Sequence, residues 1–180
     1  MTTELQRRKL EKVFASYDAD GDGVIDGLDI TAMAQIWCDT YGVAPYSPGW
    51  RRIHGAAARM WRGMRGSDGP DGEKRVTVAE WVAWADKPEF PEFVTNAAVP
   101  FSLAVFDVAD ADRDGRINHA EMFAAQSKSG MRSEDTQRIF DRLDTDRDGY
   151  LTSEEYGRAA HEFYLSADPD APGNVIAGEL

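Results

Sequence analysis

Carboxylate side chains recur at alternate positions in three short stretches of the chain. The stretches begin at Asp18, Asp110 and Asp144, and each has the pattern Asp-x-Asp-x-Asp-Gly. On a tightly turned loop, alternate side chains point inward while the residues between them face water. Clustered oxygens are the ligands of hard divalent cations, and Ca²⁺ takes about six to eight of them. These residues therefore indicate the binding of a divalent cation.

Two of the stretches open complete 12-residue calcium-loop patterns, with ligands at positions 1, 3, 5, 7, 9 and 12. Glycine at position 6 permits the turn, because a residue without Cβ tolerates positive φ. The predicted ligands of loop 3 (110–121) are Asp110, Asp112, Asp114, the carbonyl of Arg116, Asn118 and Glu121. Those of loop 4 (144–155) are Asp144, Asp146, Asp148, the carbonyl of Tyr150, Thr152 and Glu155. We expect one Ca²⁺ in each loop.

Loop 1 (18–29) differs from the other two at position 12, where aspartate replaces glutamate. Its predicted ligands are Asp18, Asp20, Asp22, the carbonyl of Val24, Asp26 and Asp29. Because the side chain of Asp29 is one methylene shorter, we expect it to bind through one oxygen. A smaller, near-octahedral site favours Mg²⁺ relative to a loop that ends in glutamate. The sequence thus predicts three Ca²⁺ sites, with Mg²⁺ also binding, especially in loop 1.

A fourth copy of the pattern, loop 2, is damaged. When it is aligned on Val76 and Glu80 as positions 8 and 12, Gly69 falls at position 1 and Lys74 at position 6. Position 1 then offers no side-chain oxygen, and position 6 carries a cation and a Cβ, so we expect no metal there. Its remaining role would be structural, through short two-stranded ribbons between paired loops. The predicted ribbon pairs are Val76 with Ile25 and Ile117 with Leu151.

Amphipathic helices must flank these loops and position their ligands. Apolar side chains before loop 1 follow the helical spacing i, i+3, i+4, i+7 at Leu10, Val13, Phe14 and Tyr17. The expected helices are 3–17, 27–40, 49–65, 77–86, 97–109, 119–129, 133–143 and 153–165. Pro88 and Pro91 are expected to break the helix over 87–96 and to make a packed corner there.

These elements predict an all-α fold of four helix–loop–helix units, packed as two pairs in one compact body. Residues 1–87 would form the N-terminal pair and residues 97–165 the C-terminal pair. Residues 166–180 form a tail, which the sequence leaves either packed on the body or mobile.

Composition restricts the partners and the compartment. The chain of 180 residues has a formal charge of −12, which argues against nucleic acid or an anionic membrane as a partner. A single cysteine, Cys38, fits a reducing compartment. The first ten residues lack the apolar core of a signal peptide, and no run approaches the roughly 18 apolar residues of a membrane span. We expect a cytoplasmic monomer without membrane insertion.

The chain resembles members of the EF-hand superfamily, and the resemblance is carried by the loop sequences DADGDGVIDGLD, DADRDGRINHAE and DTDRDGYLTSEE. With loops 1, 3 and 4 intact and loop 2 degenerate, the chain resembles the sarcoplasmic calcium-binding proteins and their bacterial calerythrin relatives. This resemblance implies a compact Ca²⁺ buffer or transporter, with the metal ligands at the positions named above. No phosphate-binding glycine loop, nucleophile turn or His/Cys metal cluster is present, so we expect no catalytic residue and no enzyme activity.

Two alternative functions remain open at this point. A Ca²⁺ sensor would expose a methionine-rich surface to a target protein, although the six methionines do not concentrate in one helix after a loop. The coelenterazine-binding photoproteins share the loop pattern, and the five tryptophans could line a cavity for an aromatic small molecule.

Overall fold

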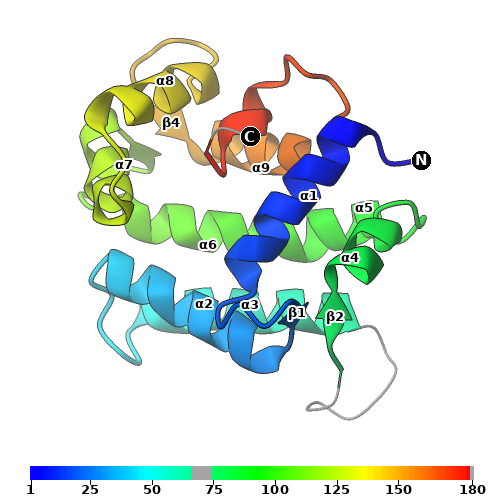
Figure 1. Ribbon diagram of the computed structural model, residues 1–180. Coiled ribbons are helices and arrows are strands. Elements are labelled where there is room, and N and C mark those ends of the chain that lie inside the picture. Colours follow the sequence, from blue (N-terminus) through cyan, green and yellow to red (C-terminus); the bar gives the residue numbers. More distant parts are fainter. Residues whose placement is uncertain (66–73, 179–180) are drawn as a thin grey trace.

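The computed structural model describes residues 1–65 and 74–178, which are mostly helical with two short ribbons (Figure 1). This architecture confirms the predicted all-α fold with short β contacts between loops. The N-terminal half contains α1 (Glu4–Tyr17), β1 (Val24–Ile25), α2 (Gly27–Thr40), α3 (Pro48–Arg65), β2 (Val76–Thr77) and α4 (Val78–Trp84).

The C-terminal half repeats this order after a helical connection. Its elements are α5 (Phe90–Phe93), the π-helical turn η1 (Val94–Ala98), α6 (Val99–Ala109), β3 (Arg116–Ile117), α7 (His119–Gln126), the 3₁₀ turn η2 (Ser127–Ser129), α8 (Ser133–Leu143), β4 (Leu151–Thr152), α9 (Ser153–Leu165) and the 3₁₀ turn η3 (Pro172–Val175). Each acidic loop thus lies between two helices, as predicted.

Capping boxes start the helices that leave the loops. In α2, α7 and α9 the residue at loop position 9 is the N-cap, and the acidic residue at position 12 accepts from the backbone N–H of that cap. This reciprocal pair satisfies N–H groups that have no partner within the helix. The same residues that were predicted as ligands therefore also set where the exit helices begin.

The prediction of a non-helical corner over 87–96 was wrong. Helix begins at Phe90 and continues through η1 into α6, so that Phe90–Ala109 form one helical run. Pro91 lies in the first turn of α5, where the missing N–H needs no partner. Pro100 lies in the first turn of α6, two residues after the π turn, and the wider turn accommodates a ring that would clash inside a regular helix. Phe90 and Phe93 are buried, as their apolar character requires.

This long helix joins the two halves of the molecule. Phe101, Ala104 and Val105 belong to the N-terminal hydrophobic cluster, whereas Phe106 and Ala109 belong to the C-terminal one. In Figure 1, α6 runs between α2 and α3 on one side and the C-terminal helices on the other. By length and composition alone, Phe90–Ala109 is the one helix among the described residues that could cross a membrane, and half of it is buried in this fold.

The tail packs on the body through its described part. Turn η3 contacts α8 and α9, and Asn174 is buried. The ammonium of Lys9 in α1 donates to the carbonyl of Ser166 at 2.8 Å and to Oδ1 of Asn174 at 3.0 Å. In addition, the hydroxyls of Tyr17 and Tyr164 lie 2.5 Å apart between α1 and α9. The first helix, the last helix and the tail therefore form one packed unit.

Candidate metal centres

Two antiparallel ribbons place the loops in pairs. Ile25 of loop 1 pairs with Val76 of loop 2, and Ile117 of loop 3 pairs with Leu151 of loop 4. All four side chains are buried. The predicted ribbon pairs are therefore confirmed, and the inward residue at position 8 anchors each loop to the core.

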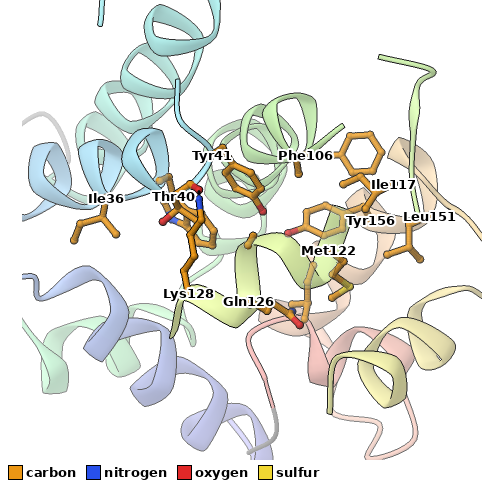
Figure 2. A pocket seen from close by; sticks show the side chains of 14 residues that line it. Ile36, Thr40, Tyr41, Phe106, Ile117, Met122, Gln126, Lys128, Leu151 and Tyr156 are labelled. Carbon is orange, nitrogen blue, oxygen red and sulfur yellow. Dashed lines mark hydrogen bonds between the residues drawn. The ribbon is translucent and has the colours of Figure 1, made fainter. Parts of the chain in front are cut away.

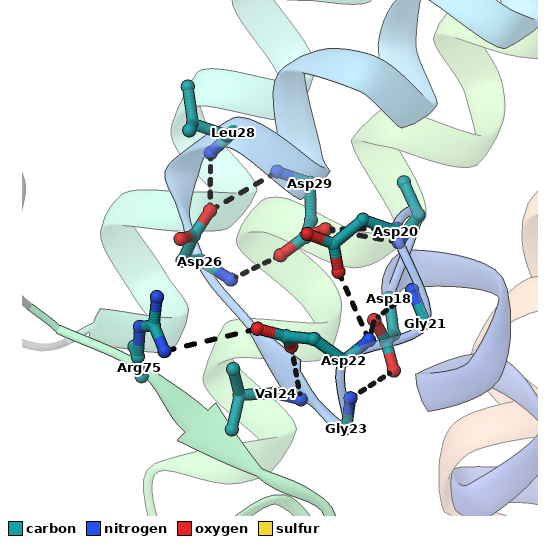
Figure 3. A network of polar contacts seen from close by, with 11 residues as sticks. Asp18, Asp20, Gly21, Asp22, Gly23, Val24, Asp26, Leu28, Asp29 and Arg75 are labelled. Atoms are coloured by element: carbon teal, nitrogen blue, oxygen red, sulfur yellow. Dashed lines mark hydrogen bonds and ion pairs between the residues drawn. The ribbon is translucent and has the colours of Figure 1, made fainter.

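Loop 1 wraps its backbone around the carboxylate of Asp18 (Figure 3). One oxygen of Asp18 accepts from the N–H of Gly21 at 2.9 Å, and the other accepts from Gly23 at 2.9 Å. Gly23 has φ 87°, which a residue with Cβ rarely adopts. Asp18, Asp20 and Asp22 offer oxygens that lie within 4.8 Å of one another. Three carboxylates at this separation repel one another, and a divalent cation between them would remove that repulsion.

The residue at position 12 distinguishes loop 1 from the other two. Asp29 uses its carboxylate to accept from the N–H groups of Ala19 at 3.2 Å and Asp26 at 2.8 Å. Glu121 and Glu155 make the equivalent contacts, and each also belongs to a group of carboxylates within 4.8 Å in its own loop. The group found in loop 1 holds Asp18, Asp20 and Asp22 instead. The shorter side chain thus leaves position 12 out of the cluster that glutamate joins.

Loop 4 is the most buried of the three centres. Asp144 and Glu155 are each 7% exposed, and Asp146 completes their group of oxygens. Oδ1 of Asp144 is buried without a hydrogen-bond partner. A buried carboxylate oxygen without a donor is costly, and a cation between these groups would satisfy it. Although burial raises the pKa of Glu155, hydrogen bonds from Thr152 and Thr145 hold it below its ordinary value, so the carboxylate remains ionised.

Loop 3 brings together Asp110, Asp112 and Glu121 in the same way. Gly115 at position 6 has φ 86°, and its N–H donates to Oδ2 of Asp110 at 2.9 Å. Gly149 of loop 4 repeats both features with Asp144. Loops 3 and 4 are therefore near copies of one geometry, and the donor set of each fits a hard divalent cation.

The remaining predicted ligands line the same three loops. At position 5 the carboxylate accepts from the N–H of position 7, in the pairs Asp22–Val24, Asp114–Arg116 and Asp148–Tyr150. At position 9 the side chain caps the exit helix, through Asp26, Asn118 and Thr152. An oxygen engaged in a cap reaches a cation best through a bridging water, as is common at this position.

Sequence reasoning missed a role for the side chains of two arginines, which reach across the ribbons. Arg116 lies 3.9 Å from Asp148 of the paired loop, and its guanidinium lies over the ring of Tyr150. In the other pair of loops, Arg75 of loop 2 lies 3.9 Å from Asp22 of loop 1 (Figure 3). Both arginines occupy position 7 of their loops and face position 5 of the partner. The recurrence of arginine at position 7 was the signal available in the sequence.

Only the last part of loop 2 lies among the described residues. Residues 66–73, which include Gly69 at the predicted position 1, lie outside them. Glu80 at position 12 accepts from the N–H and the hydroxyl of Thr77, both at 2.8 Å. These hydrogen bonds lower the pKa of Glu80. In this part of the chain, Glu80 therefore acts as half of a capping box, and Val76 as the ribbon anchor.

Comparison with known proteins agrees with this geometry. A family model described as "EF-hand domain pair" matches residues 103–161, and one described as "EF hand" matches residues 10–32. Calerythrin from Saccharopolyspora erythraea is 22% identical, over 92% of this chain and 95% of its own. The probable calcium-binding protein CML16 from Oryza sativa subsp. japonica is 30% identical, over 82% of this chain and 75% of its own.

Solved structures show the same fold. A calcium-binding protein from Streptomyces coelicolor, whose structure concerns prokaryotic calcium-mediated regulation by that protein, superposes with a TM-score of 0.72 and 29% identity. The match covers 91% of this chain and 99% of that one. Calcium-loaded apo-aequorin from Aequorea victoria gives a TM-score of 0.73 at 21% identity, covering 93% of this chain and 94% of that one, which is a likeness of fold alone.

The fold and the paired acidic loops define a calcium-binding protein built from helix–loop–helix units. The chain belongs to the EF-hand family and is similar to calerythrin within it.

Proposed function

We propose that this protein is a Ca²⁺ buffer or transporter whose folding is coupled to ion binding, with no catalytic activity. The observation that carries this proposal is that the C-terminal EF-hand pair is covered from within the chain. Tyr41, the C-cap of α2, and Ile176 of the tail pack against the C-terminal cluster, and Lys128 after α7 donates to the carbonyl of Thr40. A buffer does not need to expose this surface to a partner, because its function is complete once the ion is bound.

Electrostatic repulsion within the loops supports coupling between ion binding and folding. Three divalent cations would halve the formal charge of −12. Without them, the carboxyl groups of Asp144 and Glu155 remain almost fully buried beside each other. Ligands that bind only the folded chain stabilise it by mass action, so the ion-free chain should be looser.

Calorimetric titration and thermal melting test this proposal together. Titration with Ca²⁺ should count three sites, and chelation should lower both the helical circular dichroism signal and the melting temperature. Fewer than two tightly bound Ca²⁺ per chain would contradict calcium buffering, whereas unchanged helicity and melting after chelation would contradict only the coupling. Repeating the titration in Mg²⁺ should weaken Ca²⁺ binding most at loop 1, where Asp29 lies outside the carboxylate group.

The same proposal places the protein in the cytoplasm as a monomer. Cys38 is the only cysteine of the chain and is buried as a free thiol. Burial, together with the neighbouring Asp39, raises the pKa of this thiol, which keeps it protonated and unreactive. Such a thiol suits a reducing compartment and offers no route to a covalent dimer.

A Ca²⁺ sensor is the second candidate, because the covered face also contains a pocket of about 380 Å³ (Figure 2). Four of the residues that line it belong to the calcium loops and their exit helices: Ile117, Met122, Leu151 and Tyr156. Trp37 of α2 and Tyr41 at its C-cap also line the pocket. The regulatory role described for the Streptomyces coelicolor protein favours this reading as well.

Binding of a hydrophobic dye distinguishes the sensor from the buffer. If Ca²⁺ opens the pocket, dye fluorescence should rise strongly on addition of Ca²⁺. A flat or falling signal supports the buffer, in which α2 remains in place. A third reading, an aromatic small molecule held between the hydroxyls of Tyr41 and Tyr156, predicts absorbance beyond that of tryptophan in the purified protein.

A further inference from the structure

Each pair of loops carries one arginine at position 7. This position supplies its backbone carbonyl to the cation, so its side chain is not needed as a ligand. The residue is arginine in loops 2 and 3, at Arg75 and Arg116. It is Val24 in loop 1 and Tyr150 in loop 4. The guanidinium of Arg116 lies 4.6 Å from the centre of the Tyr150 ring, and this contact holds it at the ribbon.

Both guanidinium groups lie beside an aspartate at position 5 of the partner loop. Nη1 of Arg75 lies 3.9 Å from Oδ2 of Asp22 (Figure 3). Nη1 of Arg116 lies 3.9 Å from Oδ2 of Asp148, and its Nε lies 4.0 Å from Oδ2 of Asp114 in its own loop. Arg116 therefore lies between the position-5 carboxylates of loops 3 and 4, whereas Arg75 faces loop 1.

The arginines approach the oxygen of each carboxylate that the backbone leaves open. Oδ1 of each position-5 aspartate accepts from the N–H of position 7 at 2.8 to 3.0 Å. Among the described residues, no hydrogen bond reaches Oδ2 of these aspartates, which are Asp22, Asp114 and Asp148. A carboxylate at position 5 is a ligand of the cation, and Oδ2 is the oxygen that it has left to offer. The guanidinium and a bound cation would thus share one oxygen.

From this geometry we infer that Arg75 and Arg116 are internal counter-ions that compete with Ca²⁺ and set the affinity of the loops they face, an inference that rests on the proposed function. In the ion-free chain, a guanidinium offsets part of the repulsion among the acidic side chains. A cation bound to Oδ2 brings two positive charges next to the arginine, which opposes its binding. The same contact therefore stabilises the ion-free loops and weakens Ca²⁺ binding.

A purely structural role for the arginines predicts a different result. Their side chains are 63% exposed in Arg75 and 45% exposed in Arg116, and exposed ion pairs contribute little to stability. If each arginine only held its loop in shape, its removal would weaken Ca²⁺ binding as well as stability. Competition predicts opposite signs, namely a less stable ion-free chain and tighter Ca²⁺ binding.

The experiment titrates the full chain with Ca²⁺ against a chelator and follows three backbone N–H signals by ¹⁵N NMR. The signals are those of the position-6 glycines, each of which donates to the position-1 aspartate of its own loop and so reports one site: Gly23, Gly115 and Gly149. Arg116→Gln should raise the Ca²⁺ affinity of loops 3 and 4 about fivefold, as expected for removal of one screened charge beside a divalent ion. Loop 1 should be unchanged. Arg75→Gln should raise the affinity of loop 1 alone by a similar factor.

Charge-matched variants separate this contact from the general field of the protein. Arg113→Gln and Arg147→Gln remove the same charge from position 4 of loops 3 and 4. Both positions are exposed, and the ion pairs that the described residues form with the position-5 aspartates of these loops involve Arg116 instead. Each control should therefore raise Ca²⁺ affinity clearly less than Arg116→Gln does.

Thermal melting in excess chelator completes the test. Arg116→Gln should lower the melting temperature of the ion-free chain more than Arg113→Gln does, although it binds Ca²⁺ more tightly. Weaker or unchanged Ca²⁺ binding in Arg116→Gln, or equal effects of Arg113→Gln, would overturn the inference and leave calcium buffering intact. If the glycine signals of the unsubstituted protein did not respond to Ca²⁺, the proposed function itself would be wrong and this inference with it.

Discussion

At the scale of single residues, the three loops differ in one side chain with a direct chemical consequence. Asp29, Glu121 and Glu155 all hold the N–H groups of loop positions 2 and 9. Only the glutamates also lie within a carboxylate group of their own loop. Because the shorter carboxylate of Asp29 already accepts from these backbone N–H groups, its oxygens extend less far toward the cation. Ion preference in loop 1 should therefore depend on one methylene group.

Exchanging this methylene tests the dependence. Asp29→Glu should raise the preference of loop 1 for Ca²⁺ over Mg²⁺ by about tenfold, because a longer carboxylate can supply two oxygens to the larger ion. Calorimetric titration with Ca²⁺ in the presence and absence of Mg²⁺ measures the change. The reciprocal variant Glu121→Asp should shift loop 3 in the opposite direction. An unchanged preference in both variants would show that position 12 does not set selectivity here.

At the scale of the element, the capping boxes link metal binding to helix formation. Thr77 and Thr152 both occupy position 9, both are N-caps, and both donate to the glutamate at position 12. Thr152 belongs to a loop with converging carboxylates, whereas loop 2 lacks an oxygen at position 1. We therefore predict that the same local structure serves two functions in loop 4 and one function in loop 2.

A pair of threonine substitutions separates these functions. Thr77→Ala should lower the free energy of unfolding by about 1 kcal/mol through loss of the cap of α4, with Ca²⁺ affinity unchanged. Thr152→Ala should lose a similar cap energy and also weaken Ca²⁺ binding at loop 4 about tenfold. Urea unfolding and calorimetric titration measure the two quantities on the same samples. A loss of Ca²⁺ binding in Thr77→Ala would contradict a purely structural role for loop 2.

At the scale of the whole molecule, the chain termini close the fold on themselves. Lys9 of α1 is fully buried and reaches the end of α9 and the tail. Gly173 lies so close to α9 that a Cβ there would come within 2.2 Å of the carbonyl of Ala159. These contacts make the two EF-hand pairs and the tail one packed body.

The buried ammonium gives this closure a pH dependence. Burial lowers the pKa of Lys9 to about 8, with Glu162 opposing the shift, whereas the unfolded value is about 10.4. Between these values the unfolded chain binds more protons, so stability should rise with pH. Burial raises the pKa of Tyr17, Tyr156 and Tyr164. Above about pH 10 the folded chain therefore retains phenolic protons that the unfolded chain loses, and this opposes the rise in stability.

Urea unfolding of the Ca²⁺-saturated protein between pH 8 and 10 measures this effect. The free energy of unfolding should rise by about 1–2 kcal/mol over this range, since one proton is involved. Lys9→Met should abolish the slope, and Lys87→Met, at an exposed position of equal charge, should leave it intact. A slope that survives in Lys9→Met would assign the titration to another group.

The sequence by itself determined what depends on short spacings: the three acidic loops, the damaged fourth, the ribbon pairs and most of the amphipathic helices. The loops and helices depend on residues within one or two turns of each other, and the ribbon pairs follow from the recurrence of an apolar residue at position 8 of each loop. Only the tertiary structure decided the helical path through Pro91 and Pro100, the arginines that face the partner loops, and the cover that α2 and the tail place on the C-terminal pair. The arginine contacts and the cover join residues distant along the chain. The helical path through the two prolines is local, but the burial of Phe90 and Phe93 favours it over a break in the helix.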